Sequence, residues 1–393
     1  MKKLDNLIRK VCVVSGSRAD YGILKNLIKE IYLDKYLSLQ LIVTGQHLSP
    51  EFGFTYKEIE EDGFIIDNKV ECLVSSDTAI GISTSTALGI IRFSDVFNSQ
   101  KPDLIILLGD RFEIFSVSIA ALMARIPVVH IHGGELTEGA IDDALRHSIT
   151  KMAHIHFVAA LEYQKRVIQL GENPKNVHLV GSLAVDVIKK TKFIKKEQLV
   201  KVLKIKLRKK NLLVTFHPVT LENKLSQIQM NELIKSLSNL KDTTILFTLP
   251  NSDVDSRIII QIITEFTDNN NHAYLFDNLG HKIYFSLIKI FDGVIGNSSS
   301  GLIEVPCYKK GTINLGDRQK GRLSASSVIN CETRENEIKA ALAKLYSEEF
   351  NKTLQDVINP YGVGGASDAI LSKIKTISLN GIIRKSFYNL ELS

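Results

Sequence analysis

The stretch "VVHIHGGELTEGAIDDALRHSITKMAHIHF" (Val128–Phe157) contains a complete strand–helix–strand pattern. A short apolar run is followed by two glycines, by a helical pattern over Ile141–Ala153 that opens on two aspartates, and by a second apolar run. This alternation is typical of a parallel, doubly wound sheet. Carboxylates and histidines gather just after the first run, where an open α/β sheet binds its ligands. The stretch therefore predicts an α/β fold with a polar site at a strand end.

The same pattern recurs on both sides of this stretch. Further strand candidates are VCVVSGS, LSLQLIVTG, DLIILLGD, VHLVGS, NLLVTFHPV, TTILFTLPN, GVIGNSSS and GTINLGD. The lysine-rich segment Lys189–Lys210 interrupts the pattern once. We expect two Rossmann-like domains, residues 1–185 and 186–375, and a tail, 376–393, that packs back on the first domain. Polar clusters at strand ends in both halves predict that the domains face one central cleft, a glycosyltransferase-B-like architecture.

Composition narrows the class of protein. The 393 residues are 44% hydrophobic and 23% charged, as in an ordinary globular chain. No apolar stretch approaches the roughly 20 residues of a membrane span, no signal-peptide pattern begins the chain, and the four cysteines form no CxxC pair. Only Phe193 interleaves with the lysines of Lys189–Lys210, which disfavours nucleic-acid binding. We expect a cytoplasmic protein without membrane or nucleic-acid partners, and the net charge of +6 suits an anionic substrate.

The segment "GNSSSGLIEV" (Gly296–Val305) follows an apolar strand pattern and leads into a helical one. Ser298 and Ser299 then lie at a helix N-terminus, where free N–H groups and hydroxyls hold a phosphate. The simpler alternative is an ordinary serine N-cap, for which one serine suffices. Glu304, about a turn and a half further on, is placed to reach a ribose.

The segment "SGSRADYG" (Ser15–Gly22) has the same strand–loop–helix form but lacks the GxGxxG dinucleotide motif. Arg18 is a candidate clamp for a diphosphate, with a surface ion pair to Asp20 as the alternative. In "LLGDRFE" the neighbouring Asp110 and Arg111 are read either as a structural pair or as site residues.

In "HIHGGE", His130 and His132 point to the same face of a strand. That spacing serves some metal sites, whereas a core histidine is the alternative for His130; His132, beside the glycines, is better placed for a substrate. Asp142, at the start of the next helix, is a candidate acid/base carboxylate. His217 in "TFHPVT" follows a strand pattern of the second domain and is expected in the same cleft.

Taken together, the motifs resemble one family: the hydrolysing UDP-N-acetylglucosamine 2-epimerases of sialic-acid biosynthesis and their relatives. The matching stretches run in family order from about residue 11 to about residue 370: SGSRADYG, VTGQHLSPEFG, LLGDRFEI, HIHGGE, IDDALRHSITKMAHIHF, RVIQLGENP, FHPVT, IGNSSSGLIEVP, INLGDRQKGR and NPYGVGGAS.

This resemblance implies a reaction in two steps on a UDP-sugar. UDP leaves C1 while a base removes the C2 proton, and water then adds to the 2-acetamidoglucal with the opposite configuration at C2. UDP-N-acetylglucosamine gives N-acetylmannosamine and UDP in this way. The resemblance implies no cofactor, no catalytic metal, and a homodimer or homotetramer.

The resemblance also carries roles over to matching positions. Asp110, Asp142, Glu135, His132 and His217 form the catalytic set. The nucleotide-site positions are Arg18, Asp20, Asn251, Ser298, Ser299, Glu304 and Arg318, and Tyr284 is a candidate for stacking on the uracil.

One departure bears on catalysis. Many members of the family read His-x-Glu-Gly-Gly with a catalytic glutamate, but the glutamate position here is His132. An extra residue also lies in the loop before Asp142. The role passes to His132, which is favoured by position, or to Glu135, which is favoured by chemistry, and both assignments stay open.

The substrate has alternatives as well. The main prediction is UDP-N-acetylglucosamine, and the first alternative is UDP-2,4-diacetamido-2,4,6-trideoxyglucose of the legionaminic-acid pathway. Others are a non-hydrolysing UDP-sugar 2-epimerase, a glycosyltransferase on the same fold, and a sensor that binds UDP-sugars without turnover.

Overall fold

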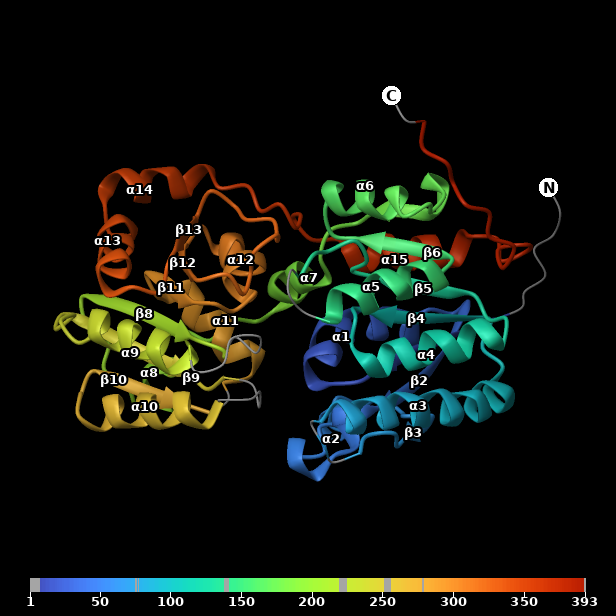
Figure 1. Cartoon of the computed structure of the whole chain (residues 1–393), viewed down its shortest axis with the longest axis horizontal. Helices are drawn as coiled ribbons and strands as arrows, with labels where there is room; N and C mark the ends of the chain where they lie inside the picture. Colours follow the sequence, from blue (N-terminus) through green and yellow to red (C-terminus); the bar gives the residue numbers. More distant parts are fainter. Residues whose placement is uncertain are drawn as a thin grey trace. The chain divides into compact units, whose positions relative to one another are not determined.

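The computed structural model describes residues 8–74, 76, 78–137, 141–218, 225–250, 256–277 and 279–391. The chain divides into two compact units. Unit 1 comprises the chain up to Leu136, Ile141–Val187, and the chain from Tyr361 onward; unit 2 consists mainly of Ile188–Pro360. Figure 1 shows the elements of both units.

Unit 1 is built on a seven-stranded parallel sheet with the order β3-β2-β1-β4-β5-β6-β7. Its strands are β1 (Arg9–Ser15), β2 (Leu37–Thr44), β3 (Asn68–Val70), β4 (Leu104–Leu108), β5 (Val128–Ile131), β6 (Ile155–Val158) and β7 (Val177–Leu179). Its α-helices are α1 (Arg18–Leu33), α2 (Tyr56–Glu61), α3 (Ala79–Gln100), α4 (Phe112–Met123), α5 (Ile141–Met152), α6 (Leu161–Gln169) and α15 (Ala366–Thr376), while α7 (Leu183–Lys190) crosses the unit boundary. Short 3₁₀ turns are η1 (Gly45–Leu48), η2 (Pro50–Phe52) and η3 (Pro174–Asn176).

The near-continuous apolar run of β1 follows from its burial on both faces. Val11 and Val13 belong to one hydrophobic cluster, with residues of α1 and α15. Cys12 and Val14 belong to a second cluster, with residues of α3 and α4. Successive side chains of a strand point to opposite faces, and a parallel sheet covered by helices on both faces needs apolar residues at every position.

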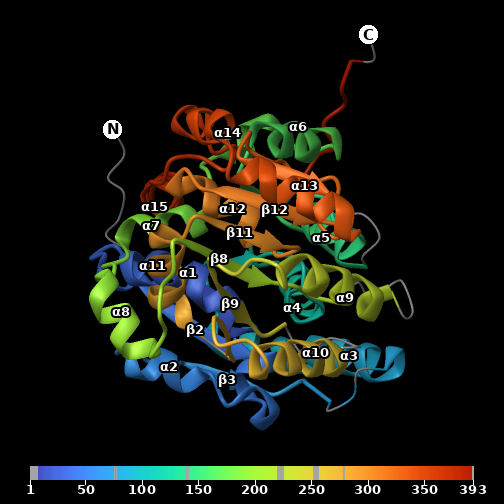
Figure 2. The same cartoon turned by 90° about the vertical axis from the view of Figure 1, so that its left-hand side faces the viewer.

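Unit 2 contains a six-stranded parallel sheet with the order β10-β9-β8-β11-β12-β13. Its strands are β8 (Lys210–Thr215), β9 (Thr243–Thr248), β10 (Ala273–Phe276), β11 (Gly293–Gly296), β12 (Gly311–Leu315) and β13 (Val328–Cys331). Its helices are α8 (Lys196–Leu203), α9 (Leu225–Leu237), α10 (Ser256–Asp268), α11 (Gly280–Ile290), α12 (Ser300–Ile303), α13 (Glu335–Leu345) and α14 (Glu348–Thr353), with 3₁₀ turns η4 (Val305–Tyr308) and η5 (Leu354–Asp356). Helix α9 contacts both α10 and α13, as the view in Figure 2 shows.

Both sheets contain the strand order 3-2-1-4-5-6, counted along each unit, which defines the doubly wound nucleotide-binding fold. The prediction of an α/β chain with two Rossmann-like domains is therefore confirmed. Among the described residues, no helix combines the length and the apolar character needed to cross a lipid bilayer.

Helix α15 belongs to unit 1, whereas the sequence pattern assigned residues 186–375 to the second domain and only 376–393 to the first. Ile370 and Ile374 of α15 are fully buried in the cluster that covers β1. Asp186 holds the start of α15 on unit 1. Its carboxylate accepts the backbone N–H groups of Gly365, Ala366 and Ser367 at 2.6, 3.1 and 2.6 Å. These N–H groups at a helix start have no partner within the helix, so a buried carboxylate satisfies them.

Candidate active site

Arg146 is the centre of the polar cluster on unit 1. Its side chain is almost fully buried, and it contacts the Asp110 carboxylate with Nη2. Its Nη1 donates to the Glu135 carbonyl oxygen at 2.8 Å and lies 3.4 Å from Asp143 Oδ1. Arg146 therefore ties the end of β4 and the loop after β5 to helix α5. The predicted site residues Asp110 and Glu135 are thus brought together around Arg146, which was not among the predicted site residues.

His132 and Glu135 form a pair in the loop after β5. Glu135 Oε1 lies 3.3 Å from His132 Nδ1, and Ser182 Oγ lies 3.5 Å from Nε2 of the same ring. The Glu135 side chain is 6% exposed and the His132 side chain 12%. His132 also has a φ of +65°, which a non-glycine residue adopts rarely and which recurs at functional sites. The two candidates for the family's glutamate role are thus neighbours in contact.

His130 matches the core-histidine alternative rather than a metal ligand. It is fully buried, its Nε2 lies 2.8 Å from the Gly109 carbonyl oxygen, and its Nδ1 lies 3.1 Å from Thr150 Oγ1. Burial is the main reason that the pKa of His130 falls to about 3, so the ring is neutral. With both nitrogens engaged, His130 fixes the residue before Asp110 relative to α5.

The two glycines beside this cluster are required by packing within unit 1. A Cβ on Gly134, whose φ is +79°, would lie 2.5 Å from the Tyr163 carbonyl oxygen of α6. A Cβ on Gly133 would lie 3.0 Å from both His130 Nδ1 and Thr150 Oγ1. The space beside these two glycines is therefore already occupied by protein atoms.

A second arginine, Arg111, is held where β1, β2 and β4 end. Its Nε and Nη2 donate to the two carboxylate oxygens of Glu113 at 3.2 and 3.1 Å, and Glu113 is fully buried. Burial opposes the charge of Arg111, but Glu113, Asp20 and Asp142 outweigh it and raise its pKa above the ordinary value. One interpretation of the sequence was that the neighbours Asp110 and Arg111 form a structural ion pair. The structure does not show this pair. Glu113 was missed as a site residue, although the polar positions of "GDRFE" directly after an apolar run were a usable signal.

Asp20 and Arg18 separate in the structure. Asp20 Oδ2 is buried without a hydrogen-bond partner among the described residues, and burial, partly offset by Arg111, raises the pKa of Asp20 to about 6. Arg18 instead pairs with Glu58, whose two carboxylate oxygens lie 3.0 and 2.9 Å from Nε. The half-exposed Arg18 thus forms an ion pair with Glu58 instead of the predicted alternative pair with Asp20. The arginine that lowers the pKa of Asp20 is Arg111.

On unit 2, the turn after β11 is fixed by Asn297. Its Oδ1 accepts the His217 backbone N–H at 2.7 Å, and its Nδ2 donates to the His217 carbonyl oxygen at 2.8 Å. Gly296, with φ +143°, precedes it, and a Cβ there would overlap the Thr215 carbonyl oxygen at 1.8 Å. Only glycine allows β11 to pass β8 this closely. The loop that follows β8 and the loop that follows β11 are therefore locked together.

His217 and Arg318 belong to this cluster. Arg318 Nη1 donates to the Asn297 carbonyl oxygen at 3.1 Å. Burial, followed by the charge of Arg318, lowers the pKa of His217 to about 3. A neutral imidazole beside an arginine is a hydrogen-bonding group rather than a cation at neutral pH.

Ser298 and Ser299 lie at the turn as predicted, but the helix they begin is short. Helix α12 spans only Ser300–Ile303, so it supplies little macrodipole with which to attract an anion. Tyr284 Oη donates to Ser300 Oγ at 2.9 Å, and that hydroxyl contacts the Glu304 carboxylate. Burial raises the pKa of both Glu304 and Tyr284. Asn251, the remaining nucleotide-site prediction, lies outside the described residues.

The structure thus gathers two clusters at strand ends, one on each unit. The cluster on unit 1 holds carboxylates, an imidazole and two arginines. The cluster on unit 2 holds backbone N–H groups, serine hydroxyls, an imidazole and an arginine, which is the donor chemistry that binds phosphate oxygens.

Comparison with known proteins identifies the family. The family model of UDP-N-acetylglucosamine 2-epimerase matches residues 29–375. A GDP/UDP-N,N'-diacetylbacillosamine 2-epimerase (hydrolyzing) of Campylobacter jejuni is 46% identical over 97% of this chain and 99% of its own length. The polysialic acid biosynthesis protein P7 of Escherichia coli is 39% identical over 90% of both chains.

Solved structures agree on the fold. The UDP-GlcNAc 2-epimerase of Neisseria meningitidis, solved with UDP-GlcNAc, superposes with a TM-score of 0.81 at 18% identity over 93% of this chain and 99% of its own. This chain therefore belongs to the UDP-N-acetylglucosamine 2-epimerase family, as a hydrolysing nucleotide-sugar 2-epimerase.

Proposed function

We propose that the substrate is UDP-N,N'-diacetylbacillosamine, the 2,4-diacetamido-2,4,6-trideoxy sugar that was the first alternative to UDP-N-acetylglucosamine. The products are UDP and 2,4-diacetamido-2,4,6-trideoxymannose. The observation that carries this choice is the 46% identity, over nearly the whole of both chains, to a relative named for that substrate.

The reaction consists of an elimination and a hydration. A base takes the C2 proton, the C1–O bond breaks, and its electron pair leaves with UDP while C1 and C2 become doubly bonded. Water then gives its oxygen to C1, and a proton reaches C2 from the opposite face. The site must stabilise positive charge at C1, negative charge on the departing diphosphate, and two proton transfers.

His132 is our candidate for the base, with Glu135 as its partner. One contact and one difference in burial support this choice: the Glu135 carboxylate lies 3.3 Å from His132 Nδ1, and the Glu135 side chain is the more buried of the two. A carboxylate on one ring nitrogen fixes the tautomer in which the other nitrogen accepts a proton. With Glu135 fixing its tautomer, the His132 imidazole can act as the base in place of the glutamate that many family members use.

Asp110 and Asp142 are proposed to face the sugar. Asp110 is held by the buried Arg146, and Asp142 lies close enough to Arg111 to contribute to its raised pKa. Carboxylates in these positions stabilise charge at C1 and provide the second acid/base for hydration.

Unit 2 is proposed to hold the nucleotide. Ser298, Ser299 and Arg318 donate to the diphosphate, and neutral His217 adds a hydrogen bond to it. Glu304 and Tyr284 bind the nucleoside, and Arg18, Asp20 and Asn251 complete the predicted binding set.

The test is turnover in D₂O, followed by proton and phosphorus NMR. We expect UDP release and a free sugar deuterated at C2 from UDP-N,N'-diacetylbacillosamine, and a much lower kcat/KM for UDP-N-acetylglucosamine. A site that hydrogen-bonds a substrate group rejects an analogue lacking it by as much as ~10⁴-fold. Including GDP-N,N'-diacetylbacillosamine distinguishes the two nucleotides in the relative's name.

UDP-N-acetylglucosamine is the second candidate, because the family model that matches residues 29–375 is named for it. Faster turnover of UDP-N-acetylglucosamine to N-acetylmannosamine would establish that substrate instead. A product that retains UDP would contradict hydrolysis and point to a non-hydrolysing epimerase.

A further inference from the structure

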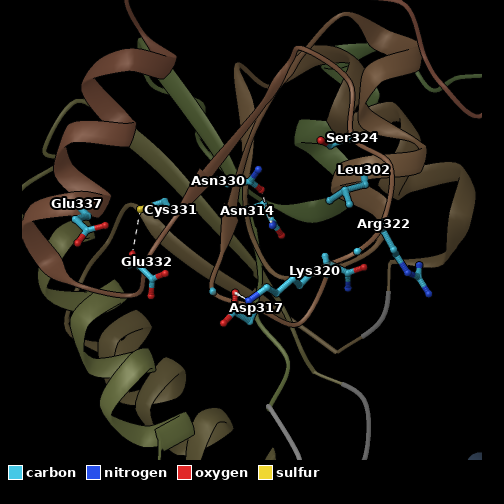
Figure 3. A pocket seen from close by; sticks show the side chains of 13 residues that line it. Leu302, Asn314, Asp317, Lys320, Arg322, Ser324, Asn330, Cys331, Glu332 and Glu337 are labelled. Atoms are coloured by element: carbon cyan, nitrogen blue, oxygen red, sulfur yellow. Dashed lines mark hydrogen bonds and ion pairs between the residues drawn. The ribbon is translucent and has the colours of Figure 1, made fainter. Parts of the chain in front are cut away.

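A cavity of about 410 Å³ lies within unit 2, where β12 and β13 end (Figure 3). It is lined by residues between Leu302 and Glu337, and neither His132 nor Glu135 is among them. Groups that assist the proposed base are therefore found among the immediate contacts of His132 rather than in this cavity.

Both ring nitrogens of His132 have a polar neighbour within unit 1. Glu135 Oε1 lies 3.3 Å from Nδ1, and Ser182 Oγ lies 3.5 Å from Nε2. A carboxylate, an imidazole and a hydroxyl in this order recur in hydrolases, in which the hydroxyl attacks the substrate. Ser182 is only 1% exposed, so its hydroxyl is not placed for such an attack. Any contribution of Ser182 to the reaction therefore acts through His132.

The hydrogen bonds of Ser182 leave its proton for His132. Ser182 Oγ accepts the backbone N–H of Ala184 at 3.2 Å, and this contact does not use the hydroxyl proton. Among the described residues, the acceptor within reach of that proton is His132 Nε2. A buried hydroxyl is rarely left without an acceptor. In the neutral ring, Nδ1 then carries the proton and faces Glu135, while Nε2 accepts from Ser182.

The backbone around Ser182 holds this hydroxyl in place. The Ser182 N–H donates to the Tyr361 carbonyl oxygen at 2.8 Å, and Tyr361 is fully buried with its Oη 3.1 Å from Tyr163 Oη. Gly181, with φ +85°, allows the close approach, since a Cβ there would lie 3.2 Å from the same carbonyl oxygen. Ser182 is thus fixed by a segment nearly 180 residues later in the sequence, at the point where the chain returns to unit 1.

We propose that Ser182 is a positioning residue for the elimination step, which holds the His132 ring and stabilises its protonated form. This inference rests on the proposed function, in which His132 Nε2 takes the C2 proton as C1 and C2 become doubly bonded and UDP leaves with the electron pair of the C1–O bond. A hydroxyl donates to a neutral ring nitrogen and accepts from a protonated one. Because a hydrogen bond from a charged group is about twice as strong as one between neutral groups, the contact strengthens as the proton is transferred. It therefore stabilises the transition state more than the bound substrate.

The competing role for Ser182 is structural, because its hydroxyl also accepts the Ala184 N–H near the start of α7. Ser182→Ala removes both contacts, whereas Ser182→Thr keeps a hydroxyl for both. A purely structural role lowers the melting temperature of Ser182→Ala without affecting one kinetic constant selectively.

The kinetic test uses the full-length protein and UDP-N,N'-diacetylbacillosamine. We expect kcat of Ser182→Ala to fall about 5- to 10-fold with KM within about 2-fold of wild type, and Ser182→Thr to recover most of the loss. Ser367→Ala is the matched control, because it also removes a fully buried hydroxyl from unit 1, and it should keep the wild-type kcat. An unchanged kcat in Ser182→Ala, or an equal fall in Ser367→Ala, overturns the proposal.

The spectroscopic test needs neither substrate nor turnover. In the full-length protein labelled with ¹⁵N-histidine, the His132 signals are identified by their absence from His132→Gln. We expect a protonated Nδ1 and an unprotonated Nε2 in the neutral ring of the wild type. The Nε2 resonance should move downfield in Ser182→Ala, where the donor is lost, and stay near its wild-type position in Ser367→Ala.

The two measurements separate this inference from the proposed function. An Nε2 resonance that is the same in wild type and Ser182→Ala overturns the role of Ser182, even if the protein hydrolyses UDP-sugars. A shifted resonance in a protein that hydrolyses no UDP-sugar confirms the contact and contradicts the proposed function instead.

Discussion

At the scale of single residues, the proposed reaction depends on buried polar side chains that pair with more exposed site residues. Glu135 supports His132, Glu113 supports Arg111, and Arg146 holds Asp110. In each case a nearly buried partner restricts a side chain with greater exposure. Removing the partner should therefore alter the reaction more than the affinity for UDP.

The first prediction concerns Glu135→Gln. The amide cannot stabilise the imidazolium that forms when His132 takes the C2 proton, so we expect kcat to fall by about 10²-fold or more, within the range of general acid/base groups. The Kd of UDP should stay within about 3-fold, since Glu135 is assigned no nucleotide contact. Glu162→Gln, on the exposed start of α6, is the control. Unchanged kcat in Glu135→Gln would exclude the pair as the base.

The second prediction concerns pH and Asp20. Its folded pKa of about 6 is higher than the ordinary value of 3.8, so Asp20 favours folding most below pH 4, and this contribution is lost as the pH rises through 6. Above pH 6, ionised Asp20 costs as much as about 3 kcal/mol, and Asp20→Asn should raise the free energy of unfolding there. We expect the gain in urea denaturation at pH 8 and none at pH 4. The same difference at both pH values would contradict the raised pKa.

At the scale of elements, a few backbone positions decide where helices and strands join. The start of α15 and the end of β11 are the clearest cases, because each depends on a contact far away in the sequence.

Asp186→Asn tests the start of α15. The carboxylate accepts three backbone N–H groups there, and an amide oxygen can replace only part of this interaction. We expect a loss of about 1–3 kcal/mol in the free energy of unfolding, measured by urea denaturation. Asp368→Asn, an exposed acid in the first turn of the same helix, should cost less than about 1 kcal/mol. Equal losses in the two variants would show that Asp186 contributes only charge near a helix end.

Gly296→Ala tests the end of β11. The new methyl group would overlap the Thr215 carbonyl oxygen, so β8 and β11 must separate and the Asn297–His217 contacts must change. We expect a fall in melting temperature of at least several degrees together with a loss of UDP affinity of at least about 10-fold. Gly53→Ala is the control, because it has a positive φ of 77° with open space around it and therefore isolates backbone strain from the clash. A Gly296→Ala protein that binds UDP normally would show that the turn is not needed for the nucleotide.

At the scale of the whole molecule, the last part of the chain completes the first unit. Beyond α15, Lys385 donates to the carbonyl oxygens of Lys151 and Ala153 and lies 2.7 Å from the buried Glu172. Burial raises the pKa of Glu172, but contacts with His156, Lys151 and Lys385 outweigh it and lower that pKa to about 2. The C-terminal segment is therefore part of the stability of unit 1.

Lys385→Met tests this contribution. It leaves two backbone acceptors without their donor and removes one of the two lysine partners of Glu172, and we expect a loss of about 1–3 kcal/mol in the free energy of unfolding at pH 7. Because the lowered pKa of Glu172 stabilises the fold above about pH 4.5 and this term is lost as the pH falls towards 2, the difference should shrink in acid. Lys373→Met, on α15, is the control without a contact to Glu172. A difference that persists unchanged at pH 2.5 would contradict the Glu172 pair.

The sequence by itself determined the fold class and the strand-end positions of several predicted site residues. Apolar runs and helical patterns depend on residues a few positions apart, so β5 and α5 were predicted close to their observed bounds. The strand-end positions of Asp110, His132 and Ser298 followed from the same local patterns, because parallel strands present their carboxyl ends at one edge. The ordered motifs, through their resemblance to the family, predicted the type of reaction.

Only the tertiary structure decided how these residues are paired. Asp110 meets Arg146 across 36 residues, Arg18 meets Glu58 rather than Asp20, and Asp186 meets Gly365 across 179 residues. The length of α12 and the packing that excludes a Cβ at Gly134 also depend on neighbours distant in the chain. A local sequence pattern predicts which side chains lie at a strand end. The partners of those side chains depend on how helices and strands that are distant in the sequence pack against one another.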